Sequence, residues 1–275
     1  KVLNLLCKGS EKHCTAQLGK TPAQHLEGIK ETISYAQSKN ISVNLYLEDW
    51  SNGIKQSRDY LFDLIDGLNG YPVCRFMLPD TLGILNPLET AEYIKLMCEK
   101  FPHLHFDFHA HNDYDLAVAN SLAAAVNGAA GLHTTINGLG ERAGNTPLAS
   151  IHAILKDHFG ITSSIDESRL YEASKLVEYY SGIAVPVNQP VVGEKVFTQV
   201  AGIHADGLMK DEEIYTIFDT KKILNRPATV QISKTSGLAG IAYWINQTYG
   251  LEGDKALDKR DPLVIAMKDW IDREY

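Results

Sequence analysis

The chain has 275 residues, of which 44% are hydrophobic and 22% are charged, and its formal net charge is -8. A chain of this length predicts one large α/β unit followed by a smaller one, each able to bury a core. The acidic balance argues against polyanion binding, so neither nucleic acid nor an anionic membrane surface is an expected partner.

Along the first 160 residues, short apolar or β-branched runs alternate with amphipathic stretches of helical period. The runs predict strands at Val2–Leu6, Val43–Leu47, Cys74–Leu78, His105–His109 and Gly131–Ile136. The amphipathic stretches predict helices at about Pro22–Lys39, Ser57–Leu68, Pro87–Lys100, Leu116–Asn127 and Leu148–His158. This alternation is the βαβ pattern of a parallel sheet.

After about Gly160 the alternation stops. One amphipathic helix is expected at Ile165–Gly182, an extended stretch at Ala184–Gly193, and further helices at Ala239–Tyr249 and Pro262–Arg273. We therefore expect residues 1–160 to form the sheet domain and residues 161–275 a small, mostly helical subdomain.

The four cysteines form no CxxC pair, and the first residues do not resemble a signal peptide. No apolar run approaches the roughly 18–20 residues of a membrane span. These features favour buried, reduced thiols and a cytoplasmic protein.

Polar clusters follow the predicted strands at their carboxyl ends. They are Lys8-Gly9-Ser10, Glu48-Asp49, Asp80-Thr81, the run from His109 to Asp113, and the run from Asn137 to Asn145. In a (β/α) barrel these strand ends form the active-site face. Five strands cannot close an eight-stranded barrel, so the pattern indicates either an open sheet or a barrel whose earlier units are missing from this chain.

Two histidines are candidate metal ligands. His109 and His111 lie two apart at a strand end, so both imidazoles point to the same side. A bare pair of this kind is more often two hydrogen-bonded histidines than a metal site. The following Asn112 and Asp113 favour the metal, because a ligating histidine normally donates its other N–H to an amide or carboxylate.

The stretch from Asn137 to Asn145 reads Asn-Gly-Leu-Gly-Glu-Arg-Ala-Gly-Asn and is the most specific signal in the chain. Its three glycines allow tight turns and close backbone approach, and they frame a Glu-Arg pair and an amide that can face the rim. A strand-to-helix loop, with Asn145 capping the helix that begins near Pro147, explains the same residues equally well.

Glu48 follows the second predicted strand, two residues after Tyr46 and on the same face. A carboxylate at a barrel rim can act as an acid or base, or orient one. The structural alternative is an exposed strand-end charge or a salt bridge to Arg75 or Lys55.

Two further polar residues have open interpretations. The hydroxyl of Thr81 can bind a substrate carboxylate, although a turn-forming Asx motif explains Asp80-Thr81 as well. His204 lies in the second region within Ala201–Gly207, and a lone histidine beside glycine is usually structural or solvated. No role is assigned to His13, His103, His105 and His133.

Taken together, these segments resemble a known family. The motifs are Pro79–Gly83, His109–Asp113 with Leu116–Asn120, Asn137–Asn145 and Gly202–Gly207. They occur in the order found in the isopropylmalate, homocitrate and citramalate synthases of the DRE-TIM metallolyase superfamily, over roughly Val2 to Lys210.

The resemblance implies a (β/α)8 TIM barrel whose fourth to eighth strands are present here, followed by the helical subdomain. The first three βα units, among them an Arg-Asp-Gly-Glu strand with a metal-ligating Asp and an Arg that contacts the reacting carbonyl, are missing from this chain. Truncation is favoured over natural loss, because barrel closure requires those strands.

Under the resemblance, His109 and His111 are the two histidine ligands of a divalent metal, and Asn145 lies at or near its coordination sphere. Two imidazoles with oxygen ligands suit zinc, manganese or cobalt, and suit magnesium less well. The metal would chelate the carboxylate and keto oxygen of a 2-oxo acid.

The resemblance also implies the reaction, a Claisen-type condensation of acetyl-CoA with a 2-oxo acid. Glu48 resembles the catalytic carboxylate, and Thr81 would bind the substrate carboxylate. His204, accompanied by Tyr215, would be the histidine that the subdomain inserts over a barrel, that of a partner subunit in a homodimer.

Tyr46 bears on which 2-oxo acid is used. Isopropylmalate and homocitrate synthases usually show a small residue where this chain has Tyr46, and a ring there would shrink the pocket to suit the methyl group of pyruvate. The segment Tyr46–Gly53 resembles the citramalate type, so citramalate synthase is favoured. Isopropylmalate synthase, with 2-oxoisovalerate, comes second, and homocitrate synthase remains an alternative.

Other classes fit less well. A hydroxymethylglutaryl-CoA lyase should carry a cysteine in a Gly-rich lid loop, and none of the four cysteines lies in one. A biotin-dependent carboxyl transferase needs a lysine suited to carbamylation, for which no strand matches. The non-enzyme alternative is a metal-binding remnant without the first barrel strands.

Overall fold

The computed structural model describes residues 1–199, 202–221 and 224–274. The chain divides into two compact units, Lys1–Thr162 and Ser163–Tyr275. No helix in the described ranges is both long and apolar enough to cross a membrane.

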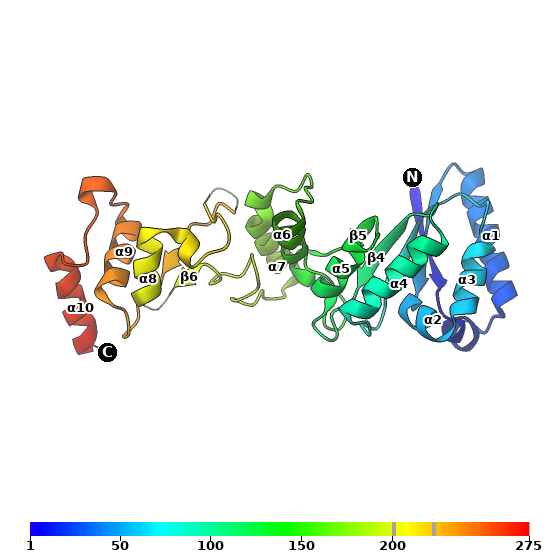
Figure 1. Ribbon diagram of the computed structural model, residues 1–275, viewed down its shortest axis with the longest axis horizontal. Helices are drawn as coiled ribbons and strands as arrows, with labels where there is room; N and C mark the ends of the chain where they lie inside the picture. Colours follow the sequence, from blue (N-terminus) through cyan, green and yellow to red (C-terminus); the bar gives the residue numbers. More distant parts are fainter. Residues whose placement is uncertain (200–201, 222–223, 275) are drawn as a thin grey trace. The chain divides into compact units, whose positions relative to one another are not determined.

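The first unit is built on a five-stranded parallel sheet (Figure 1). Its strands are β1 (Val2–Lys8), β2 (Ser42–Glu48), β3 (Val73–Asp80), β4 (Phe106–Ala110) and β5 (Gly131–His133). Each strand pairs in parallel with the next along the chain, so the order is β1-β2-β3-β4-β5. The α/β class and the parallel sheet expected from the sequence are confirmed.

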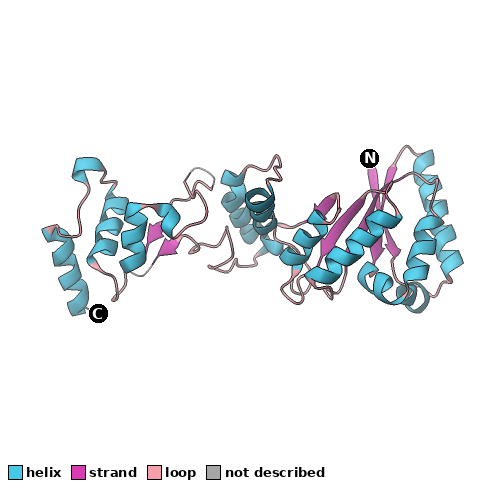
Figure 2. Cartoon of the chain, viewed as in Figure 1, coloured by secondary structure: helices cyan, strands magenta, loops and turns pink. Residues whose placement is uncertain are grey.

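Helices follow each strand of the sheet, and those before β5 connect consecutive strands (Figure 2). They are α1 (Pro22–Ser38), α2 (Trp50–Gln56), α3 (Arg58–Asp66), α4 (Pro87–Lys100), α5 (Ala117–Val126) and α6 (Leu148–Phe159), with a π-helix at His13–Gln17 and a 3-10 turn at Ile136–Gly138. Capping boxes start α1 and α4. The side chains of Thr21 and Asn86 each accept a hydrogen bond from the backbone N–H of the third helical residue, whose side chain accepts one from the backbone N–H of the capping residue.

The two faces of the sheet differ because side chains alternate along a strand. On β2, Val43, Leu45 and Leu47 are fully buried in the core, whereas Tyr46 and Glu48 are only partly buried on the opposite, inner face. On β2 the core side therefore carries the apolar residues, and the inner face carries Tyr46 and Glu48.

A bulge sets which β3 residues face inward. Val43 pairs with Val73 but Asn44 pairs with Arg75, so one extra residue, Cys74, is inserted at this point. The shift places Arg75 on the inner face opposite Asn44. Cys74 is exposed, so the expectation of a buried thiol is wrong at this position, whereas Cys7 and Cys14 are buried.

The second unit contains short elements around a small core. They are α7 (Leu170–Ser181), β6 (Thr198–Gln199), α8 (Gly202–Lys210), β7 (Thr229–Val230), α9 (Leu238–Tyr249) and α10 (Pro262–Glu274), with 3-10 turns at Glu167–Arg169, Glu212–Ile214 and Gly253–Lys255. Ile241, Ile245, Val264 and Ile271 form the core where α9 meets α10. Strands β6 and β7 pair in parallel, and the sequence analysis missed both of them and α8.

Candidate metal and substrate site

The two candidate metal ligands converge on the inner face of the sheet. His109 lies on β4, and His111 directly follows that strand. Their Nε2 atoms are 3.3 Å apart, and the ring centroids are 5.0 Å apart at an interplanar angle of 76°. The two imidazoles therefore lie on the same side of the strand, as their spacing in the sequence predicts.

This pair fits a divalent metal. Two nitrogens that each lie about 2.0–2.1 Å from a tetrahedral zinc are roughly 3.3–3.4 Å apart, which matches the separation of the two Nε2 atoms. The Nδ1 atom of each ring is buried and has no hydrogen-bond partner among the described residues, and the same holds for Oδ1 of Asn145. These are atoms that a metal site with bound water would use.

The ligand set is nevertheless incomplete within the part of the chain that the structure describes. No group of three His, Cys, Asp or Glu side chains there is arranged to hold a metal ion. Two imidazoles and one amide oxygen fit a metal only as part of a larger ligand set.

Backbone pairing with His111 places Asn145 beside the two histidines. His111 and Asn145 form an isolated antiparallel bridge, and the N–H of Asn112 donates to the carbonyl of Gly144 at 2.9 Å. Helix α6 has Pro147 at its N-cap position and no side-chain cap, so the alternative role of Asn145 as a helix cap is wrong.

Asn112 and Asp113 do not orient the imidazoles. Asn112 instead accepts from the backbone N–H of Ala117 and donates to Asp115, so it shapes the start of α5. Asp113 forms two hydrogen bonds with Arg142, at 2.8 and 2.9 Å. Because Arg142 also donates to the carbonyl of Thr81 at 2.7 Å, it joins the loops that follow β3, β4 and β5.

The glycine loop is tightly packed at Gly144. This residue has a φ of +89°, and a Cβ there would overlap the carbonyl oxygen of Gly138, which accepts from the Asn145 N–H at 2.9 Å. We expect Gly144→Ala to destabilise the protein by about 1–3 kcal/mol in urea unfolding and to weaken metal binding, because the clash displaces Asn145.

Gly160→Ala is the matched control. Gly160 also has a positive φ, +63°, but a Cβ there meets no atom within 4 Å. It should cost only the conformational penalty of about 1–2 kcal/mol and leave metal binding unchanged. Equal metal affinity in both variants would contradict the role of the loop.

The protonation of the imidazoles suits metal binding at neutral pH. Burial, together with the neighbouring His111 and His133, lowers the pKa of His109 to about 4. Burial and the charge of Arg142 lower the pKa of His111 below its ordinary value of 6.5. Both rings are therefore neutral near pH 7, the form that binds a metal.

This predicts how metal affinity depends on pH. Because both pKa values are lowered, protons compete with the metal only in acid, so affinity should be nearly level between about pH 8 and 7 and should fall as the pH drops through the lowered pKa of His111. The slope should approach two protons per metal only below about pH 4, the pKa of His109. Calorimetric zinc titration across this range is the measurement, and a tenfold loss already between pH 8 and 7 would contradict it.

Glu48 is paired with a residue that the sequence analysis did not consider. Its carboxylate forms a salt bridge with Lys8, which stands directly opposite on β1. The partners considered earlier are engaged elsewhere, Lys55 with Glu89 and Arg75 with Asp107. Lys8 was visible as part of the polar cluster after β1, but its pairing follows from the register of the strands.

Thr81 remains able to donate a hydrogen bond. Its Oγ1 accepts from the backbone N–H of Asp49 at 2.8 Å, which leaves the hydroxyl hydrogen available to a ligand. The buried carboxylate of Asp80 accepts from the N–H groups of Ile84 and Leu85, both at 3.0 Å, and so forms the turn. The Asx motif therefore explains Asp80 and leaves Thr81 as the candidate substrate contact.

Tyr46 crosses the inner face to a strand three places away. Its hydroxyl lies 3.2 Å from Nδ1 of His133 on β5. In a flat sheet β2 and β5 would be about 14 Å apart with side chains standing perpendicular to the sheet, so this contact requires the sheet to curve toward its inner face. That curvature is the one expected of a barrel wall.

His204 and Tyr215 lie together in the second unit. Their ring centroids are 4.4 Å apart, and Tyr215 follows the 3-10 turn Glu212–Ile214. His204 is on α8, within the segment that the sequence analysis singled out, although Ala201 at its start lies outside the described residues. The structure thus brings these two together, as it does the His109, His111 and Asn145 set in the first unit.

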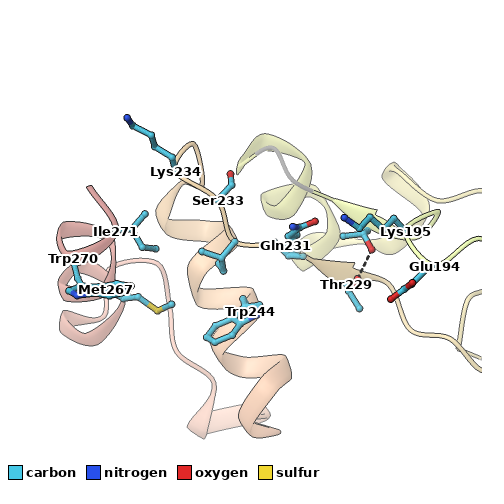
Figure 3. Close-up of a pocket in the computed structure, with 13 residues that line it drawn as sticks. Glu194, Lys195, Thr229, Gln231, Ser233, Lys234, Trp244, Met267, Trp270 and Ile271 are labelled. Atoms are coloured by element: carbon cyan, nitrogen blue, oxygen red, sulfur yellow. Dashed lines mark hydrogen bonds between the residues drawn. The ribbon is translucent and has the colours of Figure 1, made fainter. Parts of the chain in front are cut away.

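A cavity of about 690 Å³ also lies in the second unit (Figure 3). Trp244, Met267 and Trp270 from α9 and α10 line one side, and Glu194 and Lys195 lie on the other. None of the sequence-predicted site residues is among the described side chains that line it.

Comparison with known proteins gives consistent matches. The family model described as HMGL-like matches residues 1–177. A homocitrate synthase of Sulfolobus acidocaldarius is 43% identical over 206 residues, which cover 75% of this chain and 43% of that protein. A 2-isopropylmalate synthase of Acetivibrio thermocellus is 36% identical over 245 residues, which cover 86% of this chain and 47% of that protein. The chain spans about half the length of the curated relatives it matches.

A solved structure shares the fold. A hydroxymethylglutaryl-CoA lyase of Pseudomonas aeruginosa superposes with a TM-score of 0.59 at 19% sequence identity. The match covers 67% of this chain and 64% of that one. At this level of identity the similarity concerns architecture alone.

Proposed function

We propose, from the premise that this chain belongs to the HMGL-like family, that the protein condenses acetyl-CoA with a 2-oxo acid in a metal-dependent, Claisen-type reaction. The single observation that supports it best is the convergence of the His109 and His111 imidazoles at the carboxyl edge of a parallel sheet, where Asn145 adjoins them. Relatives named homocitrate synthase and 2-isopropylmalate synthase agree with a condensing enzyme.

We further propose that the sheet is the later part of an eight-stranded barrel. The order of its strands is sequential, and the Tyr46–His133 contact requires curvature toward the inner face. On β1, the strand at the sheet's edge, Val2 and Leu6 are 60% and 61% exposed. Three further βα units packed beside β1 would cover these side chains and supply the missing carboxylate ligand.

In the proposed reaction His109, His111 and Asn145 hold a divalent metal, for which zinc, manganese and cobalt fit better than magnesium. Once bound, it would supply Lewis-acid polarisation of the keto carbonyl. Thr81 donates its hydroxyl hydrogen to the substrate carboxylate, and this orients the keto carbon. The backbone N–H of Asp49 fixes the Thr81 oxygen for that purpose.

Proton transfer is assigned to Glu48 and to the His204–Tyr215 pair. The Glu48 carboxylate, paired with the Lys8 ammonium, lies at the rim, where it can accept or relay a proton. A base removes a methyl proton from acetyl-CoA, the methyl carbon bonds to the keto carbon while the keto oxygen takes up a proton, and hydrolysis of the thioester releases CoA. We propose that His204 and Tyr215 reach the site from the partner subunit of a homodimer.

Pyruvate is the proposed 2-oxo acid, which makes the product citramalate. The partly buried Tyr46 ring stands on the inner face two residues before Glu48, where it would limit the substrate side chain to a methyl group. The relatives give two alternatives, 2-isopropylmalate synthase and homocitrate synthase, and a pocket that accepts a larger side chain would favour one of them.

The test is thiol release by the full-length protein. Free CoA is measured with a thiol-trapping reagent after addition of acetyl-CoA and either pyruvate, 2-oxoisovalerate or 2-oxoglutarate, with and without the divalent metal. Metal-dependent release with pyruvate is the expected result. Preferential release with another acid would move the assignment to the matching synthase, and no release with any of them would support the metal-binding remnant instead.

A further inference from the structure

Three side chains form a connected chain across the inner face of the first unit. The Tyr46 hydroxyl lies 3.2 Å from Nδ1 of His133, and the two ring centroids are 5.4 Å apart. Nε2 of the same His133 ring lies 3.5 Å from Oδ2 of Asp107. The three residues come from β2, β5 and β4, so the chain links strands that are distant in sequence.

The tautomer of His133 sets the direction of the hydrogen bonds in this chain. A carboxylate only accepts, so Nε2 of a neutral His133 carries the proton that faces Asp107. Nδ1 of that tautomer is an acceptor, and the Tyr46 hydroxyl therefore donates to it. The position of the Tyr46 ring thus depends on His133, and that of His133 depends on Asp107.

Burial and several polar contacts hold the Asp107 carboxylate in place. It is only 3% exposed, and Arg75 contacts its two oxygens at 3.1 and 3.3 Å while His105 contacts it at 2.8 Å. Gly131 stands opposite it on β5, and a Cβ there would overlap the Asp107 carboxylate. Because glycine has no Cβ, Gly131 leaves space for the Asp107 carboxylate on this face.

His133 is not suited to be a third metal ligand, although its ring centroid is 5.6 Å from that of His109. A ligating nitrogen needs a free lone pair. Both nitrogens of His133 are already engaged, Nδ1 by Tyr46 and Nε2 by Asp107. A role toward Tyr46 is therefore the one that its contacts support.

We infer that Asp107 and His133 are positioning residues that hold Tyr46 as a fixed wall of the 2-oxo acid pocket and thereby set the size of substrate side chain accepted. This inference rests on the proposed condensation. Without the hydrogen bond from Tyr46 to His133, the ring is free to take other rotamers and the pocket enlarges. Discrimination between pyruvate and branched 2-oxo acids then falls.

The experiment compares kcat and KM of the full-length enzyme for pyruvate and for 2-oxoisovalerate. In His133→Ala and in Tyr46→Phe, we expect the ratio of the two kcat/KM values to fall about tenfold or more toward the branched acid. KM for pyruvate should rise more than kcat falls, and the metal content should stay that of the wild type. Since both variants break the same Tyr46–His133 contact, the double variant should show little further change in the ratio.

Tyr46→Phe leaves the His133–Asp107 pair in place, so it guards against a folding defect in His133→Ala. The matched control is His105→Ala, which removes another imidazole from Asp107 but does not touch the Tyr46–His133 bond, and its substrate ratio should equal that of the wild type.

Equal losses of kcat/KM for both acids in His133→Ala and Tyr46→Phe, with an unchanged ratio, would overturn the inference. So would loss of metal from His133→Ala, which would make His133 a ligand. CoA release from neither acid by the wild type would instead overturn the proposed function, and the size selection with it.

Discussion

Replacing His111 by alanine in the full-length protein is expected to remove the bound metal and to lower turnover by about a thousandfold or more. The Nε2 atoms of His109 and His111 converge at 3.3 Å, so deletion of one imidazole leaves a single nitrogen ligand in the described part of the site. Polarisation of a carbonyl by a metal is worth several kcal/mol, and each 1.36 kcal/mol corresponds to about a factor of ten in rate.

Metal content after dialysis, measured by mass spectrometry, should be read together with CoA release. His105→Ala is the appropriate control, because it removes an imidazole that comes just before the same strand and contacts Asp107, not His111. It should keep its metal. Unchanged metal content together with full activity in His111→Ala would refute the ligand role.

Glu48→Gln should reduce kcat by about 10²- to 10⁴-fold, the range that a positioned acid or base contributes. The amide keeps the shape of the side chain and an oxygen that accepts from Lys8, but it has lost the charge and the basicity. Since Lys8 is only 7% exposed and would lose its anionic partner, some loss of stability, of about 1–3 kcal/mol, should accompany the change.

A second substitution separates chemistry from folding. Lys8→Met together with Glu48→Gln removes both members of the pair, so it should recover most of the stability lost in Glu48→Gln while activity remains low. Urea unfolding and CoA release, measured on both variants, give the two readouts. A Glu48→Gln enzyme with unaltered kcat would exclude Glu48 from proton transfer.

The strands and most helices of the first unit could be predicted from local pattern. The alternation of Val43, Leu45 and Leu47 with polar neighbours specified β2, and the predicted starts of α1 and α4 at Pro22 and Pro87 are confirmed. Helix α2 was missed because its seven residues follow Asp49, which adopts a left-handed conformation, and its first turn is stabilised by burial of Trp50 rather than by a side-chain cap.

Several alternatives left open by the sequence depended on contacts between strands. The salt bridge of Glu48 goes to Lys8 because the β1–β2 register places them opposite each other. The bulge at Cys74 turns Arg75 inward toward Asp107, and Asn145 bridges to His111 instead of capping α6.

The sequence by itself determined where the strands of the first unit lie and that His109 and His111 share a face, because alternation along a strand is a local property of the backbone. Which residues then meet across the sheet, such as Lys8 with Glu48 or Tyr46 with His133, was decided only by the tertiary structure. Register, bulge and curvature arise from packing between distant segments, and short-range periodicity does not encode them.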